Sequence, residues 1–240
     1  MNTHSPKAMI LAAGLGTRLK PWTDHHPKAL ALVNGKSLLQ RNVAYLQGFG
    51  INDIIVNVHH FAQQVKDAIY ESKGWGSNIS ISDESDQVLE TGGGLKKASW
   101  YFEKCDGPFV LMNADILTDL DINAMLQQHI KEKALATLAV TKRPTSRYLL
   151  FNEKKLLCGW MNEKTGETKG KPGTRKAFSG IHIIDPEIFS HITEEGKFSM
   201  IDLYLRLCND YPVQEFDHTN GLLQDVGKPE SIAEAEKKFR

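Results

Sequence analysis

The chain has 240 residues, in which 29 Lys and Arg balance 29 Asp and Glu, so its formal net charge is zero. A neutral chain has no overall field that would draw it to nucleic acid or to an anionic membrane, so any anion must be bound by locally placed cations. The length allows a sizeable core, and we expect a single domain over residues 1–240 with no appended C-terminal module.

The first half of the chain alternates short apolar runs with helical patterns. Strands are predicted at Ala8–Ala13, Asp53–Val58, Ile79–Ser82, Phe109–Met112 and Ala136–Thr141. Helices are predicted at Leu38–Gln47, with Ser37 as N-cap and a stop at Gly48, and at Phe61–Ser72, Gly93–Phe102 and Leu120–Lys133. This alternation predicts an α/β fold, a Rossmann-like three-layer αβα sandwich with a mixed, mostly parallel central sheet.

After Lys142 the rhythm of the sequence changes. Tyr148–Phe151 and Leu156–Trp160 predict a pair of strands, and Asn162–Lys176, rich in Lys, Gly and Thr, is predicted to be a mobile loop. The remaining expected elements are a strand at Phe178–Ile184, helices at Pro186–Ile192 and Met200–Cys208, a strand near Leu222–Val226 and a helix at Ser231–Phe239. No repeat, low-complexity linker or compositional break marks a second domain.

The cysteines and the termini bear on the cellular compartment. The three cysteines, Cys105, Cys158 and Cys208, have no CxxC spacing, which disfavours a disulfide framework or a zinc site and is typical of a reducing compartment. The start, MNTHSPK, lacks the basic and apolar regions of a signal peptide. No apolar run approaches the ~20 residues of a membrane helix. We expect a cytoplasmic protein without membrane or nucleic-acid partners; its oligomeric state stays open.

A glycine-rich segment follows the first predicted strand. MILAAGLGTRLKPWTDHHPKAL places Gly14 and Gly16 in a loop, and such loops present backbone N–H groups to phosphate because glycine has no Cβ. A Walker P-loop requires GxxxxGK followed by Ser or Thr, which is absent from this segment. A GxGxxG dinucleotide motif fails at its third glycine, where Leu19 stands. What remains is GxGTRL with Pro27-Lys28 about ten residues on.

This last pattern resembles the signature of the sugar-1-phosphate nucleotidylyltransferases, which make nucleoside-diphosphate sugars. Four further segments resemble family motifs in the same order: ETGGGL (Glu90–Leu95), a second glycine loop; NAD (Asn113–Asp115), a metal-binding segment; FSGIH (Phe178–His182), a sugar contact; and DVG (Asp225–Gly227), a second metal carboxylate. The resemblance covers nearly the whole chain and implies the nucleotide-diphospho-sugar transferase fold. It is strongest to N-acetylmuramate-1-phosphate uridylyltransferases, followed by heptose- and mannose-1-phosphate guanylyltransferases.

The reaction implied by the resemblance is attack of a sugar 1-phosphate on the α-phosphorus of a nucleoside triphosphate, with release of pyrophosphate. A phosphate monoester, with a second pKa near ~6, is mostly dianionic at neutral pH and needs no general base. Catalysis then depends on positioning and charge neutralisation. By resemblance, Lys28 would lie at the α-phosphate and Arg18 would hold the β- and γ-phosphates. Asp115 and Asp225 would bind Mg²⁺.

The resemblance also implies which residues surround the substrates. The nucleotide is expected to contact Leu11, Ala12, Ala13, Gly14, Gly16, Thr17, Gly92 and Gly93. The sugar is expected to contact Glu90, Thr91, Asn113, Ser179 and Gly180. Many relatives carry a strand ending in Glu-Lys-Pro whose lysine grips the sugar phosphate. This chain has no proline there, so that role stays open among Lys142, Arg143 and Lys164, and the base and sugar are not fixed. Arg147 and Tyr148 lie where relatives line the sugar pocket, or are ordinary strand residues.

Simpler explanations exist for each residue taken alone. Gly14 and Gly16 could form a tight turn, Lys28 could be a solvated charge, and Asp115 or Asp225 could be a cap. Their joint occurrence favours function. Two other classes stay open: a cytidylyltransferase acting on phosphocholine, which needs an aromatic or acidic cage, and a non-catalytic nucleotide-sensing domain, which is expected to lack Lys28 or Asp115. The pairs His25-His26 and His59-His60 are not predicted to bind zinc.

Overall fold

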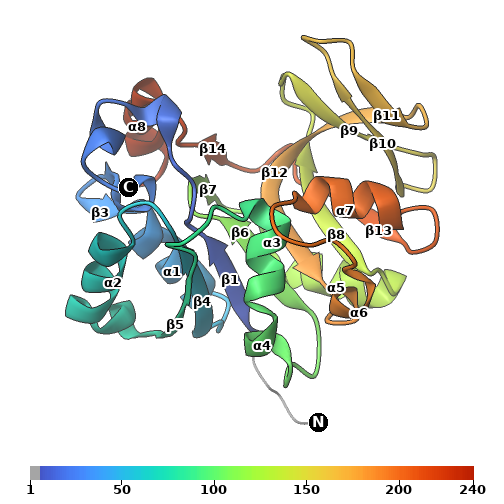
Figure 1. Ribbon diagram of the computed structural model, residues 1–240. Helices are drawn as coiled ribbons and strands as arrows, with labels where there is room; N and C mark the ends of the chain where they lie inside the picture. Colours follow the sequence, from blue (N-terminus) through green and yellow to red (C-terminus); the bar gives the residue numbers. More distant parts are fainter. Residues whose placement is uncertain (1–5) are drawn as a thin grey trace.

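The computed structural model describes residues 6–240 (Figure 1). The expectation about a signal peptide depends on MNTHSPK, and residues 1–5 of that segment lie outside the described residues. Within residues 6–240, none of the helices has the length and apolar character needed to cross a membrane.

A ten-stranded mixed sheet forms the centre of the molecule, in the order β11-β10-β9-β12-β6-β1-β4-β5, with β8 on β12 and β13 on β8. Its N-terminal half is parallel, because β1 pairs with β4 and β6 and β4 pairs with β5. The strands of this half are β1 (Ala8–Leu11), β4 (Asp53–Val58), β5 (Asn78–Asp83) and β6 (Phe109–Asn113). All carboxyl ends of these parallel strands therefore meet at one edge.

Helices cover both faces of this sheet. Ala8 and Ile10 of β1 belong to a core shared with α1, α2 and α5, whereas Met9 between them belongs to a second core shared with α3, α4, α6 and α7. These helices are α1 (Leu38–Gln47), α2 (Ala62–Glu71), α3 (Glu90–Lys97), α4 (Ser99–Phe102), α5 (Ile122–Glu132), α6 (Ile188–His191) and α7 (Met200–Leu207). The prediction of an α/β fold with helices on both faces of a mixed sheet is confirmed.

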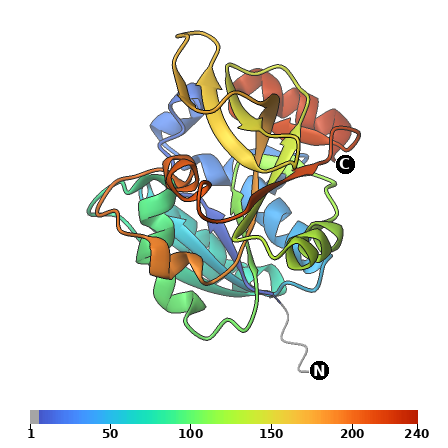
Figure 2. The ribbon, with the colours of Figure 1, turned by 90° about the vertical axis from the view of Figure 1, so that its right-hand side faces the viewer.

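The C-terminal half of the sheet is largely antiparallel and is organised by one long strand, β12 (Thr174–Ile184), which pairs with β6, β8 and β9. Its other strands are β8 (Ala136–Thr141), β9 (Arg147–Phe151), β10 (Leu157–Asn162), β11 (Thr168–Gly170) and β13 (Val213–Asp217). Both ribbon views show β9, β10 and β11 at the end of the molecule opposite α4, where the C-terminal helix α8 (Pro229–Lys238) also lies (Figures 1 and 2).

The prediction of a mobile loop over Asn162–Lys176 was wrong. The segment contains β11 and the first three residues of β12. β11 pairs antiparallel with β10, which places Gly170 opposite Gly159. All residues of β11 are exposed, so the strand needs no apolar side and gives no period-2 hydrophobic signal. A strand that is solvated on both faces reads as a polar loop.

Several short strands were also missed. β13 has the sequence VQEFD and pairs in parallel with β8, but its charged residues conceal the apolar alternation. Outside the main sheet, the missed strand β7 (Ile116–Thr118) pairs with β14 (Leu223–Asp225), the strand that was predicted near Leu222–Val226. The strands β2 (Leu32–Val33) and β3 (Lys36–Ser37), both missed, pair with each other. Strands as short as β2, β3 and β7 carry too few positions for a pattern to show.

The start of helix α1 was predicted correctly. Ser37 caps α1 as expected, since its Oγ accepts from the backbone N–H of Gln40 at 3.1 Å. A third, smaller apolar core joins Leu19, Ala31 and Val226 to Ala235 of α8. This core fixes the segments that flank Arg18, Lys28 and Asp225 on one common support.

Candidate active site

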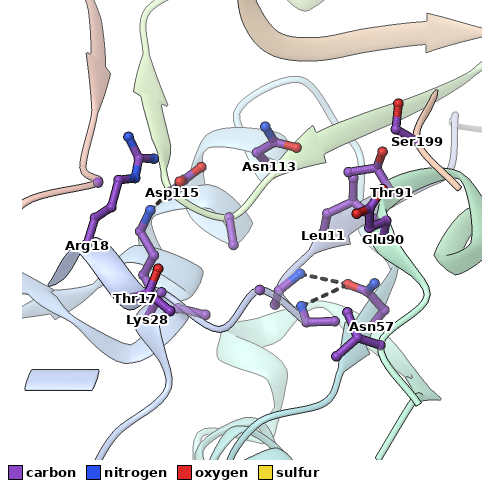
Figure 3. A pocket seen from close by; sticks show the side chains of 18 of the residues that line it. Leu11, Thr17, Arg18, Lys28, Asn57, Glu90, Thr91, Asn113, Asp115 and Ser199 are labelled. Carbon is purple, nitrogen blue, oxygen red and sulfur yellow. Dashed lines mark hydrogen bonds and ion pairs between the residues drawn. The ribbon is translucent and has the colours of Figure 1, made fainter. Parts of the chain in front are cut away.

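A cavity of about 500 Å³ opens at the carboxyl ends of β1, β4 and β6, where open α/β sheets bind ligands. It is lined by Leu11, Ala12, Ala13, Gly14, Gly16, Thr17, Arg18, Lys28, Ala29, Asn57, Val88, Glu90, Thr91, Asn113, Ala114, Asp115, Arg147, Ser199 and Gly227. Figure 3 shows Arg18, Lys28 and Asp115 at one end, and Asn57, Glu90 and Thr91 at the other. Most of the residues predicted from the sequence therefore share one cavity.

The glycines of the first loop have different tasks. Gly16 adopts a left-handed conformation (φ +64°), and a Cβ there would lie 2.8 Å from Thr23 Cγ2 and 2.9 Å from Lys28 Cβ. Thr23 Oγ1 also donates to the Gly16 carbonyl at 3.0 Å. In contrast, a Cβ at Gly14 would meet nothing within 4 Å among the described residues. Gly16 therefore folds the loop onto the Lys28 segment, whereas Gly14 leaves open space on the cavity wall.

The Lys28 ammonium forms an ion pair with Asp115 Oδ2 (Figure 3). The two side chains are 13% and 22% exposed, so the pair is partly shielded from water but faces the cavity. Lys28 begins a short 3-10 helix (Lys28–Leu30), and Asp115 lies in the turn between β6 and β7. The fold thus brings together a cation and a carboxylate 87 residues apart in sequence.

Asp225 lies beside this pair although it is not part of the cavity lining. β14 places Asp225 opposite Ile116, and the N–H of Val226 donates to the Asp115 carbonyl at 2.8 Å. The Oδ1 atom of Asp225 is buried without a hydrogen-bond partner among residues 6–240. A Cβ at Gly227 would lie 2.7 Å from this oxygen and 2.9 Å from Arg18 Nη2. Arg18 and Asp225 therefore converge on Gly227.

This arrangement fits a magnesium ion. Mg²⁺ is usually held by one or two carboxylates, with phosphate oxygens and water completing its octahedron. Asp225 lies opposite Ile116, the residue that follows Asp115, and its unpartnered oxygen could serve as a ligand. In residues 6–240, no three His, Cys, Asp or Glu side chains converge on one point. The protein therefore supplies a donor set that is complete only with substrate oxygens.

The second glycine motif is not a loop, so that part of the expectation was wrong. ETGGGL forms the first turns of α3, and Gly92 and Gly93 are buried and do not line the cavity. A Cβ at Gly92 would overlap the Phe198 ring, and one at Gly93 would overlap the Gly196 carbonyl oxygen. Both N–H groups donate to the Phe198 carbonyl, at 2.9 and 3.3 Å. These glycines allow α3 to pack closely, whereas Glu90 and Thr91 reach the cavity.

Two residues expected to contact sugar lie behind the cavity wall. Ser179 is completely buried, and its Oγ lies 2.8 Å from His218 Nε2. A Cβ at Gly180 would lie 2.9 Å from Asn113 Nδ2, so Gly180 supports the Asn113 side chain from behind. Neither residue is part of the lining. The structure places Asn113, but not Ser179 or Gly180, where a ligand could touch it.

Other lining residues were not among the predicted site residues. Asn57 is 1% exposed, and its position inside the buried strand DIIVNV was a usable signal, because a buried amide needs hydrogen-bond partners. Ser199 is the N-cap of α7 and Gly227 ends the DVG segment, but neither was predicted to contact a ligand. Arg147, which begins β9, lines the wall contributed by the C-terminal half. The sequence alone did not distinguish between a sugar-pocket residue and an ordinary strand residue at this position.

The cations proposed for the sugar phosphate do not reach the cavity. Lys142, Arg143 and Lys164 are absent from the lining, and Arg143 Nη2 instead donates to the Phe178 carbonyl at 2.9 Å. Arg175 on the neighbouring strand pairs with Glu163 at 3.2 Å, whereas Arg147 forms no ion pair within residues 6–240. Arg147 therefore joins Arg18 and Lys28 as the cationic side chains of the cavity wall.

A glycine loop after the first strand, with cations and adjacent carboxylates at the same sheet edge, defines an α/β enzyme that acts on phosphate groups of nucleotides. The chain belongs to the nucleotidyl transferase family, whose sequence profile matches residues 7–240. This membership confirms the family resemblance seen in the motifs.

Individual relatives agree with this assignment. The chain is 33% identical to the N-acetylmuramate alpha-1-phosphate uridylyltransferase of Neisseria meningitidis, over 96% of both chains. It is also 33% identical to the protein of that name from Caulobacter vibrioides, over 99% of this chain and 98% of that one. The crystal structure of HddC from Yersinia pseudotuberculosis complexed with GMP-PN is 25% identical, with a TM-score of 0.79 over 98% of this chain and 100% of that one.

Proposed function

We propose that the protein transfers uridine monophosphate from UTP to N-acetylmuramate α-1-phosphate in a Mg²⁺-dependent reaction that releases pyrophosphate. The reaction class, nucleotidyl transfer to a sugar 1-phosphate, is that of the family and its relatives. The choice of uridine and of this sugar rests on two relatives that match over nearly their whole lengths. The observation that carries the proposal is the convergence of Lys28, Asp115 and Arg18 on one cavity.

The acceptor phosphate is its own nucleophile. As a monoester with a second pKa near ~6, it carries the attacking lone pair at neutral pH without losing a proton to the protein. Consistently, the cavity lining found in residues 6–240 includes neither His nor Cys. One oxygen of the sugar phosphate bonds to the α-phosphorus. The bond between the α-phosphorus and the oxygen that bridges to the β-phosphorus breaks, and pyrophosphate leaves with that electron pair. The protein's task is to offset the charge of two polyanions.

Each charged residue at the phosphate end then has a distinct role. Asp115 and Asp225 would hold Mg²⁺, which when bound withdraws charge from the phosphate oxygens it contacts. Lys28 already lies against Asp115, so its ammonium is positioned beside the same phosphate oxygens. Arg18 would hold the departing pyrophosphate, because its planar fork can donate two parallel hydrogen bonds.

Arg147 is proposed to bind the acceptor. It lines the cavity from the C-terminal half and has no competing carboxylate within residues 6–240. Lys28 is engaged by Asp115 and Arg18 lies next to Gly227, so Arg147 is the cation left for a second anionic substrate. N-acetylmuramate 1-phosphate offers both a phosphate and a carboxylate to such a guanidinium.

A second nucleotide is favoured by one observation. The structural relative that is 25% identical was solved with GMP-PN, a guanosine compound, so GTP is the alternative donor. A panel of the four ribonucleoside triphosphates and thymidine triphosphate, each with several sugar 1-phosphates and with phosphocholine, tests the proposal through pyrophosphate release. We expect the fastest release with UTP and N-acetylmuramate 1-phosphate. Release from no pair would favour a nucleotide-sensing domain.

A further inference from the structure

Glu84 is a buried carboxyl group outside the cavity lining. It follows β5 directly and is 0% exposed, yet it forms no ion pair among the described residues. Its Oε1 accepts a hydrogen bond from Asn57 Nδ2 at 2.8 Å. Burial raises the pKa of the Glu84 carboxyl, since the charged form is desolvated. A carboxyl held in this way is retained for a structural or functional reason, because an apolar side chain would cost less to bury.

Asn57 connects Glu84 to the glycine loop. Its Oδ1 accepts from the backbone N–H of Ala12 at 2.7 Å and from that of Ala13 at 3.3 Å (Figure 3). Backbone N–H groups only donate, so the amide oxygen of Asn57 must face the loop and its NH₂ must face away. That NH₂ is buried and needs an acceptor, which Glu84 supplies. The carboxyl therefore stabilises the amide in the orientation that the loop requires.

A third glycine keeps room for this arrangement. A Cβ at Gly94 would lie 2.8 Å from Glu84 Oε1 and 2.9 Å from Asn57 Nδ2. Gly94 belongs to α3, the helix whose first turn presents Glu90 and Thr91 to the same end of the cavity. Glu84 and Asn57 thus fix the spacing between α3 and the loop after β1.

We propose that Glu84 is a positioning residue for nucleotide binding: by orienting Asn57, it holds Ala12 and Ala13 in the conformation that receives the nucleotide. This inference rests on the proposed function, which assigns the loop after β1 to the nucleoside triphosphate. All of these hydrogen bonds form within the protein itself, so the loop is pre-organised and binding does not have to order it. The N–H groups of Ala12 and Ala13 are consumed by Asn57, which leaves other loop groups to read the base.

Binding of a non-hydrolysable UTP analogue with Mg²⁺, measured by calorimetry, tests this proposal without requiring turnover. Glu84→Met keeps the side-chain length but removes the acceptor, and we expect about a tenfold rise in Kd, the size expected for leaving a buried donor unsatisfied. Glu84→Gln retains a carbonyl oxygen for Asn57 and should stay within about twofold of the unaltered protein. The KM for the sugar 1-phosphate should change in neither variant.

Two further variants separate positioning from general stability. Gln87→Met introduces a methionine at a nearby exposed residue and should leave the Kd unchanged. Gly94→Ala pushes a methyl group against Glu84 and Asn57 and should weaken nucleotide binding as Glu84→Met does, which provides a second measurement if Glu84→Met does not fold. Combining Asn57→Ala with Glu84→Met should weaken binding no more than Asn57→Ala alone, because the two residues act in series.

The possible results have distinct meanings. An unchanged Kd in folded Glu84→Met, or equal loss in Glu84→Met and Glu84→Gln, overturns the positioning role. An additive double variant does so as well. An unaltered protein that binds none of the triphosphates refutes the proposed function together with this inference, whereas normal binding by the unaltered protein confines any failure to Glu84.

Discussion

The two walls of the cavity are built in different ways. On the N-terminal wall, strand ends and a loop are fixed by buried hydrogen bonds, such as those from Asn57 to Ala12 and Ala13. The C-terminal wall contributes single side chains, notably Arg147 at the start of an antiparallel strand, and this residue is exposed. A pre-organised wall suits the reacting phosphates and a less constrained one suits a variable acceptor. Under the proposed function, reaction class and acceptor choice would belong to different halves of the sheet.

The largest expected effect follows a change in the N-terminal wall. Asp115→Asn removes the partner of Lys28 and a carboxylate that would hold Mg²⁺. We expect kcat to fall by about 10³-fold, since a charge acting on the transition state is lost. The unfolding temperature should change little, because the pair is only partly buried. Pyrophosphate release and thermal melting measure both, with Asp86→Asn, an exposed carboxylate, as control. Retained activity in Asp115→Asn would contradict the metal role.

A smaller effect is expected from the opposite wall. Arg147→Gln should raise the KM for the acceptor by about tenfold, the loss of one charged hydrogen-bonding contact, and leave the KM for the triphosphate unchanged. Steady-state kinetics with each substrate varied in turn measures this split. Arg175→Gln, which changes an exposed arginine of β12, is the matched control. A rise in the KM for the triphosphate alone would contradict the proposal, because it would indicate that Arg147 contacts the triphosphate and not the acceptor.

The same variant identifies the group that Arg147 binds. N-acetylmuramate 1-phosphate and N-acetylglucosamine 1-phosphate differ only by the lactyl ether and its carboxylate. If the guanidinium holds the phosphate, Arg147→Gln weakens both acceptors equally. If it holds the carboxylate, the variant loses its preference between them. Equal kinetics for the variant and the unaltered protein with both acceptors would remove Arg147 from the site.

The two glycine motifs offer another comparison, with an expected change in stability. Gly93→Ala places a methyl group on the Gly196 carbonyl oxygen and 3.0 Å from Leu89 Cβ, so we expect a loss of about 1–3 kcal/mol in the free energy of unfolding. Gly14→Ala meets no described atom within 4 Å and should leave that free energy unchanged, while raising the KM for the triphosphate. Denaturant unfolding and kinetics distinguish the two. Equal destabilisation would show that both motifs serve packing alone.

These differences explain what the sequence could predict. The parallel strands are buried apolar runs, and Ser37 carries an explicit capping pattern, so the N-terminal half was predicted closely. In the C-terminal half, β11 is exposed on both sides and β13 is interrupted by charges, so neither has the periodicity that marks a strand. A hydrophobic pattern appears in the sequence of an element only where at least one of its faces is buried.

The candidate site divides in the same way. Lys28 and Asp115 could be proposed because they belong to short motifs with fixed chemistry. The pairing of Asn57 with Glu84 could not be proposed, because it joins different strand ends 27 residues apart and depends on a bond that no local pattern encodes. The glycines of ETGGGL were interpreted as a ligand loop, although their backbone groups serve the packing of α3 against Phe198. A glycine cluster alone does not distinguish close packing from ligand approach.

The smallest effect concerns the junction between the two halves. His182 of β12 lies between Leu111 of β6 and Leu138 of β8, and its Nδ1 forms a hydrogen bond of 2.8 Å with the Tyr204 hydroxyl. Burial lowers the pKa of His182 to about 3. Histidine in the unfolded chain titrates near 6.5, so between pH 6.5 and 3 the unfolded chain binds a proton at this residue that the folded protein does not bind. The free energy of unfolding decreases as the pH falls below 6.5, by about 1 kcal/mol down to pH 5.5.

His182→Gln isolates this contribution. Its amide can donate to or accept from the Tyr204 hydroxyl and does not titrate, so the variant should lose about 1 kcal/mol less than the unaltered protein between pH 6.5 and 5.5. Denaturant unfolding at both values measures the difference, and His60→Gln, an exposed histidine, should keep the original slope. His129, whose pKa burial lowers to about 4, contributes equally to every protein in the comparison. Identical slopes for His182→Gln and the unaltered protein would mean that the junction admits water and that the two halves meet less tightly than their packing indicates.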